Sequence, residues 1–114
     1  PVCCAAGLAA LEFILSEGLM EQADAKGAQY ERRLAGHPAV REIRRTGLLM
    51  GVEFGDPALT QRIVLRAVER GLMTEWFLFR DTAMRIAPPL TITPAEIDES
   101  CDILLDVLRE VTGS

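Results

Sequence analysis

The sequence has 114 residues, which suits one compact domain and is too short for two of ordinary size. Apolar residues make up 49% of the chain and the formal net charge is −5, a balance typical of a folded protein and not of a disordered one. The basic residues are scattered along the chain, so we expect neither a nucleic acid nor a membrane surface as a partner. No apolar run approaches the roughly 20 residues that a membrane span needs.

Three cysteines, Cys3, Cys4 and Cys101, lack the spacing of a zinc site, and we expect no bound metal. We interpret them as reduced thiols in the core, which is typical of a cytoplasmic protein. The chain begins at Pro1, without an initiator methionine, and the next residues already have the composition of a helix interior. We therefore expect it to be a fragment of a longer chain.

Residues 2–15 predict a helix with apolar residues around most of its circumference and Glu12 as its only charge. A surface helix would show a polar face, so this one is expected to be buried against the rest of a parent protein or a second subunit. After Gly18, a second and amphipathic helix is predicted from apolar residues at helical spacing: Leu19, Ala23, Tyr30 and Leu34. Gly36 and Pro38 end it.

Residues 40–54 predict two strands separated by Gly47, the first suited to a sheet edge and the second, continuously apolar, to a sheet centre. Asp56 and Pro57 are typical of a helix start, and that helix should end at Gly71. Residues 72–79 and 83–87 predict a hairpin, with residues 80–82 as its link.

A capping box at residues 93–96 begins the last helix, whose apolar face consists of Ile97, Cys101, Leu104, Leu105, Leu108 and Val111. The order of elements predicts an α+β fold with a small antiparallel or mixed sheet of three to four strands covered by helices. There is no Gly-x-Gly-x-x-Gly motif or phosphate-binding loop, so no nucleotide site is predicted.

Arg85 is the first candidate for a binding residue, because it lies within an apolar strand between Met84 and Ile86. A buried charge without a partner is costly, so Arg85 needs an anion. A guanidinium fits a carboxylate bidentately, which makes a substrate carboxylate one candidate. A structural pair with an Asp or Glu of the same chain, or an edge-strand arginine directed into water, is the alternative.

Other candidates are weaker. Lys26 is the only lysine, which a Schiff-base enzyme requires, but its place in the middle of the second helix favours a solvated side chain. His37 has no nucleophile and carboxylate to complete a triad and is interpreted as a loop residue. Trp76, Phe77 and Phe79 could line a pocket, although strand aromatics more often belong to the core. The helical carboxylates fall on polar faces or helix starts.

Four segments, in this order, resemble the C-terminal part of class-III aminotransferases of the ornithine, acetylornithine and 4-aminobutyrate type. "PVCCAAGLAAL" resembles the beginning of the family's long interdomain helix, and "GLMEQADAKGAQYERRL" is similar to the helix after it. "VREIRRTGLLMGVEF" resembles the strand pair Val-Arg-Gly-x-Gly-Leu-x-x-Gly, and "MRIAPPLTITPAEID" resembles the ending Leu-Arg-x-x-Pro-Pro-Leu-x-Ile-Thr. Together they cover essentially the whole chain.

The resemblance implies that residues 1–114 are the small C-terminal domain of a fold-type-I homodimer, with residues 1–16 as an interdomain helix. It implies pyridoxal 5'-phosphate bound by a large domain that also supplies the Schiff-base lysine, so this segment would hold no catalytic or cofactor-binding residue and be inactive alone. Arg85 matches the arginine that binds the substrate carboxylate in many members. The implied partners are the chain's own large domain, the second subunit, a small-molecule amino donor and a 2-oxo acid.

Two departures from the family pattern leave the substrate open among amino acids, diamines and ω-amino acids. Arg45 stands where the family often has glycine, and the segment "TEWFLFRDTA" is longer and more aromatic than the usual link. Two other functions stay open: an aminomutase of the same fold, and a free-standing, non-catalytic α+β interaction module. Arg85 argues against the first, whereas Pro1 and the apolar first helix argue against the second.

Overall fold

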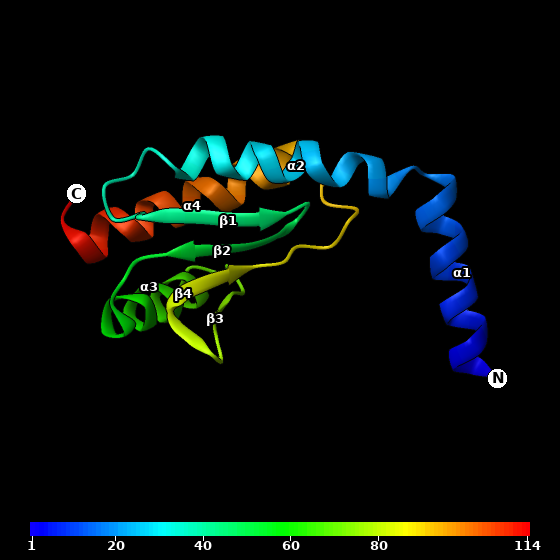
Figure 1. The fold of residues 1–114 in the computed structure, drawn as a ribbon, viewed down its shortest axis with the longest axis horizontal. Coiled ribbons are helices and arrows are strands. Elements are labelled where there is room, and N and C mark those ends of the chain that lie inside the picture. The colour runs from blue at the N-terminus through cyan, green and yellow to red at the C-terminus, as the bar shows by residue number, and fades with distance from the viewer.

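The computed structural model describes residues 1–114, and its elements follow the predicted order. Four helices and four strands are present (Figure 1): α1 (Val2–Ser16), α2 (Leu19–Leu34), β1 (Glu42–Thr46), β2 (Leu49–Glu53), α3 (Pro57–Glu69), β3 (Glu75–Phe77), β4 (Arg80–Ile86) and α4 (Pro94–Thr112). Two helix starts use the predicted caps. The Asp56 carboxylate accepts from the backbone N–H of Ala58 at 2.8 Å, and the capping box between Thr93 and Glu96 forms in both directions.

The strands form one antiparallel sheet in the order β1-β2-β4-β3. A two-residue turn joins β1 to β2, and Gly47 takes a φ of +56° there, a conformation that glycine adopts without steric cost. β1 lies at an edge and β2 in the centre, as their compositions predicted. The predicted α+β class is confirmed, with four strands that are all antiparallel.

The predicted link of the second hairpin is wrong. β4 begins at Arg80, and the turn lies at Leu78 and Phe79. The polar residues of β4 are tolerated because the outer end of this strand is exposed to solvent. Pairing between β3 and β4 is also irregular after Trp76, a feature that alternation of residue types does not reveal.

Helices α2, α3 and α4 cover one face of the sheet, and the opposite face is open (Figure 1). Strand alternation directs Met50, Val52 and Met84 toward the helices, where they are buried. The apolar faces of α2, α3 and α4 complete one core, to which they contribute Tyr30, Leu34, Ile63, Val64, Ala67, Ile97, Cys101, Leu104, Val107 and Leu108. The open face of the sheet is therefore the surface on which a site can form.

Helix α1 projects away from this body, and a 71° bend separates it from α2 (Figure 1). Gly18, with a φ of +61°, stands at the bend. The helix is apolar on all sides, as predicted, and none of its residues is buried within the chain, so its burial against a parent protein or a second subunit stays a prediction. No single helix is long and apolar enough to cross a membrane; only α1 and α2 together reach that length and composition.

Candidate functional site

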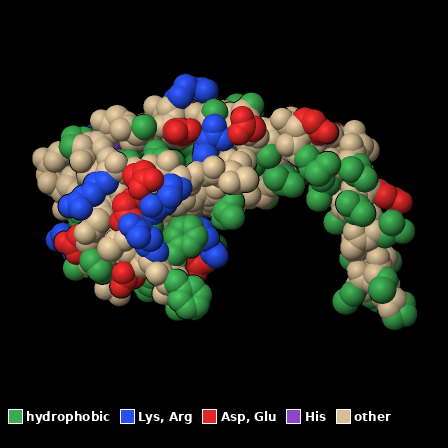
Figure 2. Space-filling view, in the orientation of Figure 1, with side chains coloured by type: hydrophobic (Ala, Val, Ile, Leu, Met, Phe, Trp, Pro, Cys, Tyr) green, Lys and Arg blue, Asp and Glu red, His purple; other side chains and the backbone are tan.

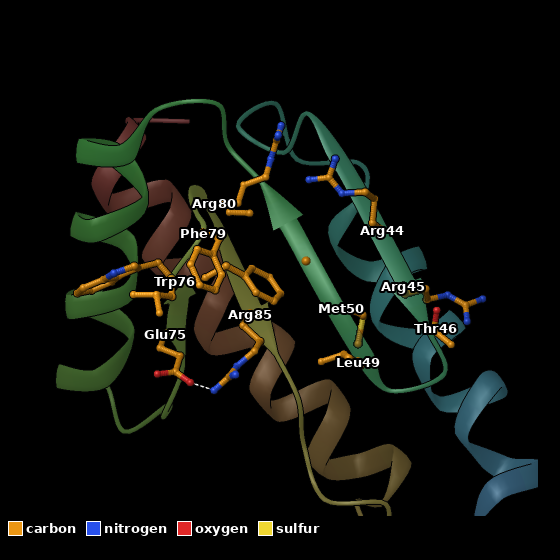
Figure 3. A pocket seen from close by; sticks show the side chains of 14 residues that line it. Arg44, Arg45, Thr46, Leu49, Met50, Glu75, Trp76, Phe79, Arg80 and Arg85 are labelled. Atoms are coloured by element: carbon orange, nitrogen blue, oxygen red, sulfur yellow. Dashed lines mark ion pairs between the residues drawn. The ribbon is translucent and has the colours of Figure 1, made fainter.

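A groove of about 700 Å³ lies on the open face of the sheet. Residues of β1 and β2 form one side, and the β3–β4 hairpin forms the other (Figure 3). Gly51 and Arg85 are partners on β2 and β4, so both lie on this face. The ring of Phe77 lies over Gly51, where a Cβ would come within 3.1 Å of the ring. A glycine at residue 51 therefore leaves room for an aromatic wall.

Arg85 forms an ion pair with Glu75, its cross-strand partner on β3 (Figure 3). Both side chains lie at the surface of the groove, with 44% of Arg85 and 57% of Glu75 exposed. Arg85 is thus not buried in an apolar setting as its neighbours suggested, because alternation directs Met84 into the core and Arg85 to the open face. The structure shows a carboxylate partner from the same chain.

Glu53 holds two other arginines at the opposite end of the groove. Its buried carboxylate accepts from Arg80 at 2.6 Å, from Arg44 at 3.1 Å and from the backbone N–H of Gly55 at 2.9 Å. Burial alone would raise the pKa of Glu53, but hydrogen bonds from the Thr82 hydroxyl and these three donors outweigh it and lower the pKa to about 2. The carboxylate is therefore charged, and it ties β1 to the start of β4.

Arg45 is directed away from the groove, toward α2 (Figure 3). It pairs with Asp24 at 2.6 Å and with Glu31 at 2.7 Å. Arg45 therefore connects β1 to α2. Its charge is satisfied within the fold.

The aromatic residues of the hairpin line the groove and are not core residues. Phe79 is 97% exposed and Trp76 37% exposed, while Phe77 is partly buried against Gly51. Figure 2 shows apolar side chains at the lower edge of the body and along α1, on either side of the open space between the two. The expectation of core aromatics is wrong because β3 is a short edge strand; the alternative, that they line a pocket, is confirmed.

The other predicted candidates lie outside the groove. Lys26 lies mid-helix as predicted, but it is not freely solvated: its ammonium donates to the carbonyl oxygen of Leu90 at 2.7 Å, on the helix-covered side. His37 is a loop residue, as predicted, and it is buried. Cys101 is a core thiol, whereas Cys3 and Cys4 on α1 are exposed, so the core interpretation is wrong for these two.

Two carboxylates that pair with arginines of the groove, Glu53 and Glu75, were not identified from the sequence. Glu53 ends an otherwise apolar strand, and alternation alone would have placed it beside Gly51 on the open face. Glu75 could not be matched to Arg85, because their pairing depends on the position of the β3–β4 turn. The alternation of residues along β2 could therefore have placed Glu53, whereas no local pattern could have paired Glu75 with Arg85.

An antiparallel sheet with helices on one face and an arginine-lined groove on the other defines a small α+β domain. The model of the family Aminotransferase class-III matches residues 1–108, and the chain belongs to that family. It is 39% identical to an acetylornithine aminotransferase of Caldanaerobacter subterraneus over 97% of this chain, and 35% identical to ornithine aminotransferase 2 of Staphylococcus aureus, also over 97%.

Solved structures of aminotransferases contain the same fold as this chain. An ornithine aminotransferase from Toxoplasma gondii superposes with a TM-score of 0.82 at 31% identity and 99% coverage of this chain. A Bacillus anthracis aminotransferase gives a TM-score of 0.85 at 28% identity over 96% of it. The chain spans only 28% of the length of each of these structures, and 28% and 26% of the two relatives.

Proposed function

We propose that this chain is the C-terminal small domain of a pyridoxal-phosphate-dependent transaminase, with residues 1–16 as the interdomain helix. The family match and the names of the relatives support amino-group transfer as the activity of the complete protein. The amino donor is an amino acid, a diamine or an ω-amino acid, and the acceptor is a 2-oxo acid. We further propose a cytoplasmic homodimer, consistent with the apolar surface that α1 leaves uncovered.

Arg85 is the residue that we propose to bind the substrate carboxylate. This role is supported by the ion-pair partners of Arg85, which differ from those of the other arginines around the groove. Arg44 and Arg80 share the buried carboxylate of Glu53, and Arg45 has two partners. Arg85 alone is paired with a single carboxylate that is itself exposed. Exchanging one exposed partner for another costs little, because ion pairs between exposed groups contribute at most about 1 kcal/mol.

The residues of this chain do not compose a site for the cofactor. The only lysine, Lys26, donates to Leu90 on the side of the sheet opposite the groove. When bound, pyridoxal phosphate supplies the electron sink for amino transfer. We infer that a large domain outside this chain holds the cofactor and supplies the Schiff-base lysine, and that residues 1–114 have no activity alone.

The proposal is tested by kinetics of the full-length protein that contains this chain. Arg85→Lys retains the charge but loses the planar fork, so we expect KM for carboxylate substrates to rise about tenfold or more. A donor without a carboxylate, 1,4-diaminobutane, should be transaminated at an unchanged kcat/KM. Arg62→Lys, at an exposed site on α3, is the matched control and should leave all constants unchanged. Unchanged kinetics in Arg85→Lys would overturn the assigned role.

A further inference from the structure

Residues 87–93 connect the end of β4 to the start of α4 and pass beside α2 (Figure 1). The connection begins two residues after Arg85, the proposed carboxylate-binding residue. The way in which it is attached to the rest of the fold therefore affects where Arg85 lies.

A single hydrogen bond joins residues 87–92 to another element of the chain. The ammonium of Lys26, in the middle of α2, donates to the carbonyl oxygen of Leu90 at 2.7 Å. The other hydrogen bond of these residues runs from the Ile92 N–H to the Pro89 carbonyl oxygen at 3.0 Å and stays within the connection. Because the donor is charged, the bond from Lys26 is stronger than one between neutral groups.

Packing beneath the connection is incomplete. A cavity of about 330 Å³ is lined by Pro88 and Pro89 and by the buried side chains of Tyr30, Met84 and Leu104. Unfilled space provides fewer contacts to resist a movement of the two prolines. The hydrogen bond from Lys26 is therefore a larger part of the restraint than it would be over a fully packed core.

The two prolines make the connection stiff between Leu90 and the end of β4. Each proline fixes its own φ near about −65° and restricts the residue before it to extended backbone. A displacement at Leu90 is thus passed on to the end of the strand and is not absorbed on the way. On the other side of the strand, the Thr74 hydroxyl donates to the Arg85 carbonyl oxygen at 2.6 Å.

We infer that Lys26 is a positioning residue for the carboxylate site. It holds Leu90, and through the two prolines it fixes the end of β4 and the place of Arg85 in the groove. This inference rests on the proposed function and adds to it a residue from the helix-covered side of the sheet. Lys26 acts through Arg85 and has no contact with the substrate.

The test compares variants of the full-length protein with 2-oxoglutarate as the acceptor. Lys26→Met keeps an unbranched side chain of similar length and removes the donor. The KM for 2-oxoglutarate should rise about fivefold, the effect expected for one lost hydrogen bond, whereas kcat should stay within about twofold. Lys26→Arg keeps a charged donor and should retain a KM close to that of the wild type. Protection of the Ile92 amide against hydrogen exchange should fall in the first variant only.

Gln29→Met is the matched control. Gln29 lies three residues further along α2 and also donates across to a backbone carbonyl, that of Pro94 at 3.0 Å, but this acceptor lies beyond residues 87–92. Loss of this bond should lower the melting temperature about as much as Lys26→Met does and should leave the KM for 2-oxoglutarate unchanged. The comparison separates positioning of the site from general stability.

Two further variants test the path from Lys26 to Arg85. Pro89→Ala loosens the connection while Lys26 is intact, so it should also raise the KM for 2-oxoglutarate. In an Arg85→Lys background, adding Lys26→Met should change this KM by less than about twofold, because residues that act through one another have non-additive effects.

The outcomes distinguish this inference from the proposed function. An unchanged KM in Lys26→Met, together with a raised KM in Arg85→Lys, would make the inference wrong and leave the role of Arg85 in place. An equal rise in Gln29→Met, an unchanged KM in Pro89→Ala, or additive effects in the double variant would contradict it in the same way. Unchanged kinetics in Arg85→Lys would remove the proposed role of Arg85 and this inference with it.

Discussion

Gly27 of α2 lies directly against the carbonyl oxygen of Gly47 in the β1–β2 turn, so that a Cβ on Gly27 would come within 1.9 Å of that oxygen. No side chain fits between the helix and the turn. The approach brings α2 close enough for Arg45 to reach both Asp24 and Glu31. The position of α2 over the sheet edge therefore depends on glycine at residue 27, which has no side chain, as well as on apolar contacts.

Replacing Gly27 by alanine should destabilise the fold. Alanine raises helix propensity by about 1 kcal/mol, but the clash is with backbone and cannot be relieved by a rotamer change. We expect a net loss of about 2–4 kcal/mol, seen as a lower melting temperature and faster hydrogen exchange in α2 and the β1–β2 turn. Gly36→Ala is the control, since a Cβ there meets nothing within 4 Å. Equal stability of the two variants would contradict this packing account.

The Glu53 carboxylate should make the groove end of the sheet sensitive to acid. Its pKa is lowered from 4.5 to about 2 in the folded state, so the unfolded chain binds the proton more readily. The stabilisation is complete above about pH 4.5 and is lost as the pH falls through about 2. Hydrogen exchange of β2 and the start of β4, corrected for intrinsic rates, should report this loss of local stability.

Glu53→Gln removes the charge at every pH. At pH 7 it should cost about 1–3 kcal/mol of local stability, because Arg80 and Arg44 lose their shared buried partner, and the acid dependence between pH 4.5 and 2 should disappear. Glu42 also pairs with Arg44, at 3.0 Å, but it is exposed. Glu42→Gln should cost less than about 0.5 kcal/mol. A similar effect of both variants would show that burial of Glu53 is not what matters.

Sequence patterns were sufficient to predict the order and type of the helices and strands, because the caps, turns and apolar periodicity that mark them are local. The cap at Asp56, the capping box at Thr93 and the glycine turn at Gly47 all formed as predicted. The periodic apolar positions of α2 and α4 became the core. These features depend on residues within one or two helical turns, which a single sequence contains in full.

The site depended on strand register, which local patterns do not contain. Placing the second turn at residues 80–82 rather than at Leu78 and Phe79 leaves Glu75 without a partner. The irregular pairing after Trp76 is the reason, because it breaks the simple count of residues across the turn. Arg85 was identified, whereas the carboxylate that defines its surroundings was not.

Protonation of His37 should destabilise the loop between α2 and β1 as the pH falls below neutral. Its Nδ1 accepts from the backbone N–H of Ala39 at 3.2 Å, and its buried Nε2 has no partner. Burial and the positive charge of Arg109 lower the pKa of His37 below its ordinary value of 6.5. The unfolded chain therefore binds the proton first, and loop stability should fall as the pH drops below about 6.5.

The readout for His37 is exchange of the Val40 amide, which donates to the His37 carbonyl at 3.0 Å. Between pH 7 and 5 its protection, corrected for intrinsic exchange, should decrease in the wild type. His37→Gln, which does not titrate in this range, should show constant protection. This window lies above that of Glu53, so the two effects separate on the pH axis. A falling protection in both proteins would exclude His37 as the cause.

Cysteine reactivity should report whether α1 is covered in the complete protein. In residues 1–114, Cys3 and Cys4 are exposed and should react rapidly with iodoacetamide. Cys101 is buried and desolvation raises its pKa to about 11, so its thiolate is scarce and its alkylation should be slow until the core opens. If α1 is the interdomain helix, full-length protein should protect Cys3 and Cys4 as well, because its large domain or second subunit covers them. Fast alkylation of both in the full-length protein, with Cys101 still protected, would show that α1 stays exposed and would remove the interdomain assignment.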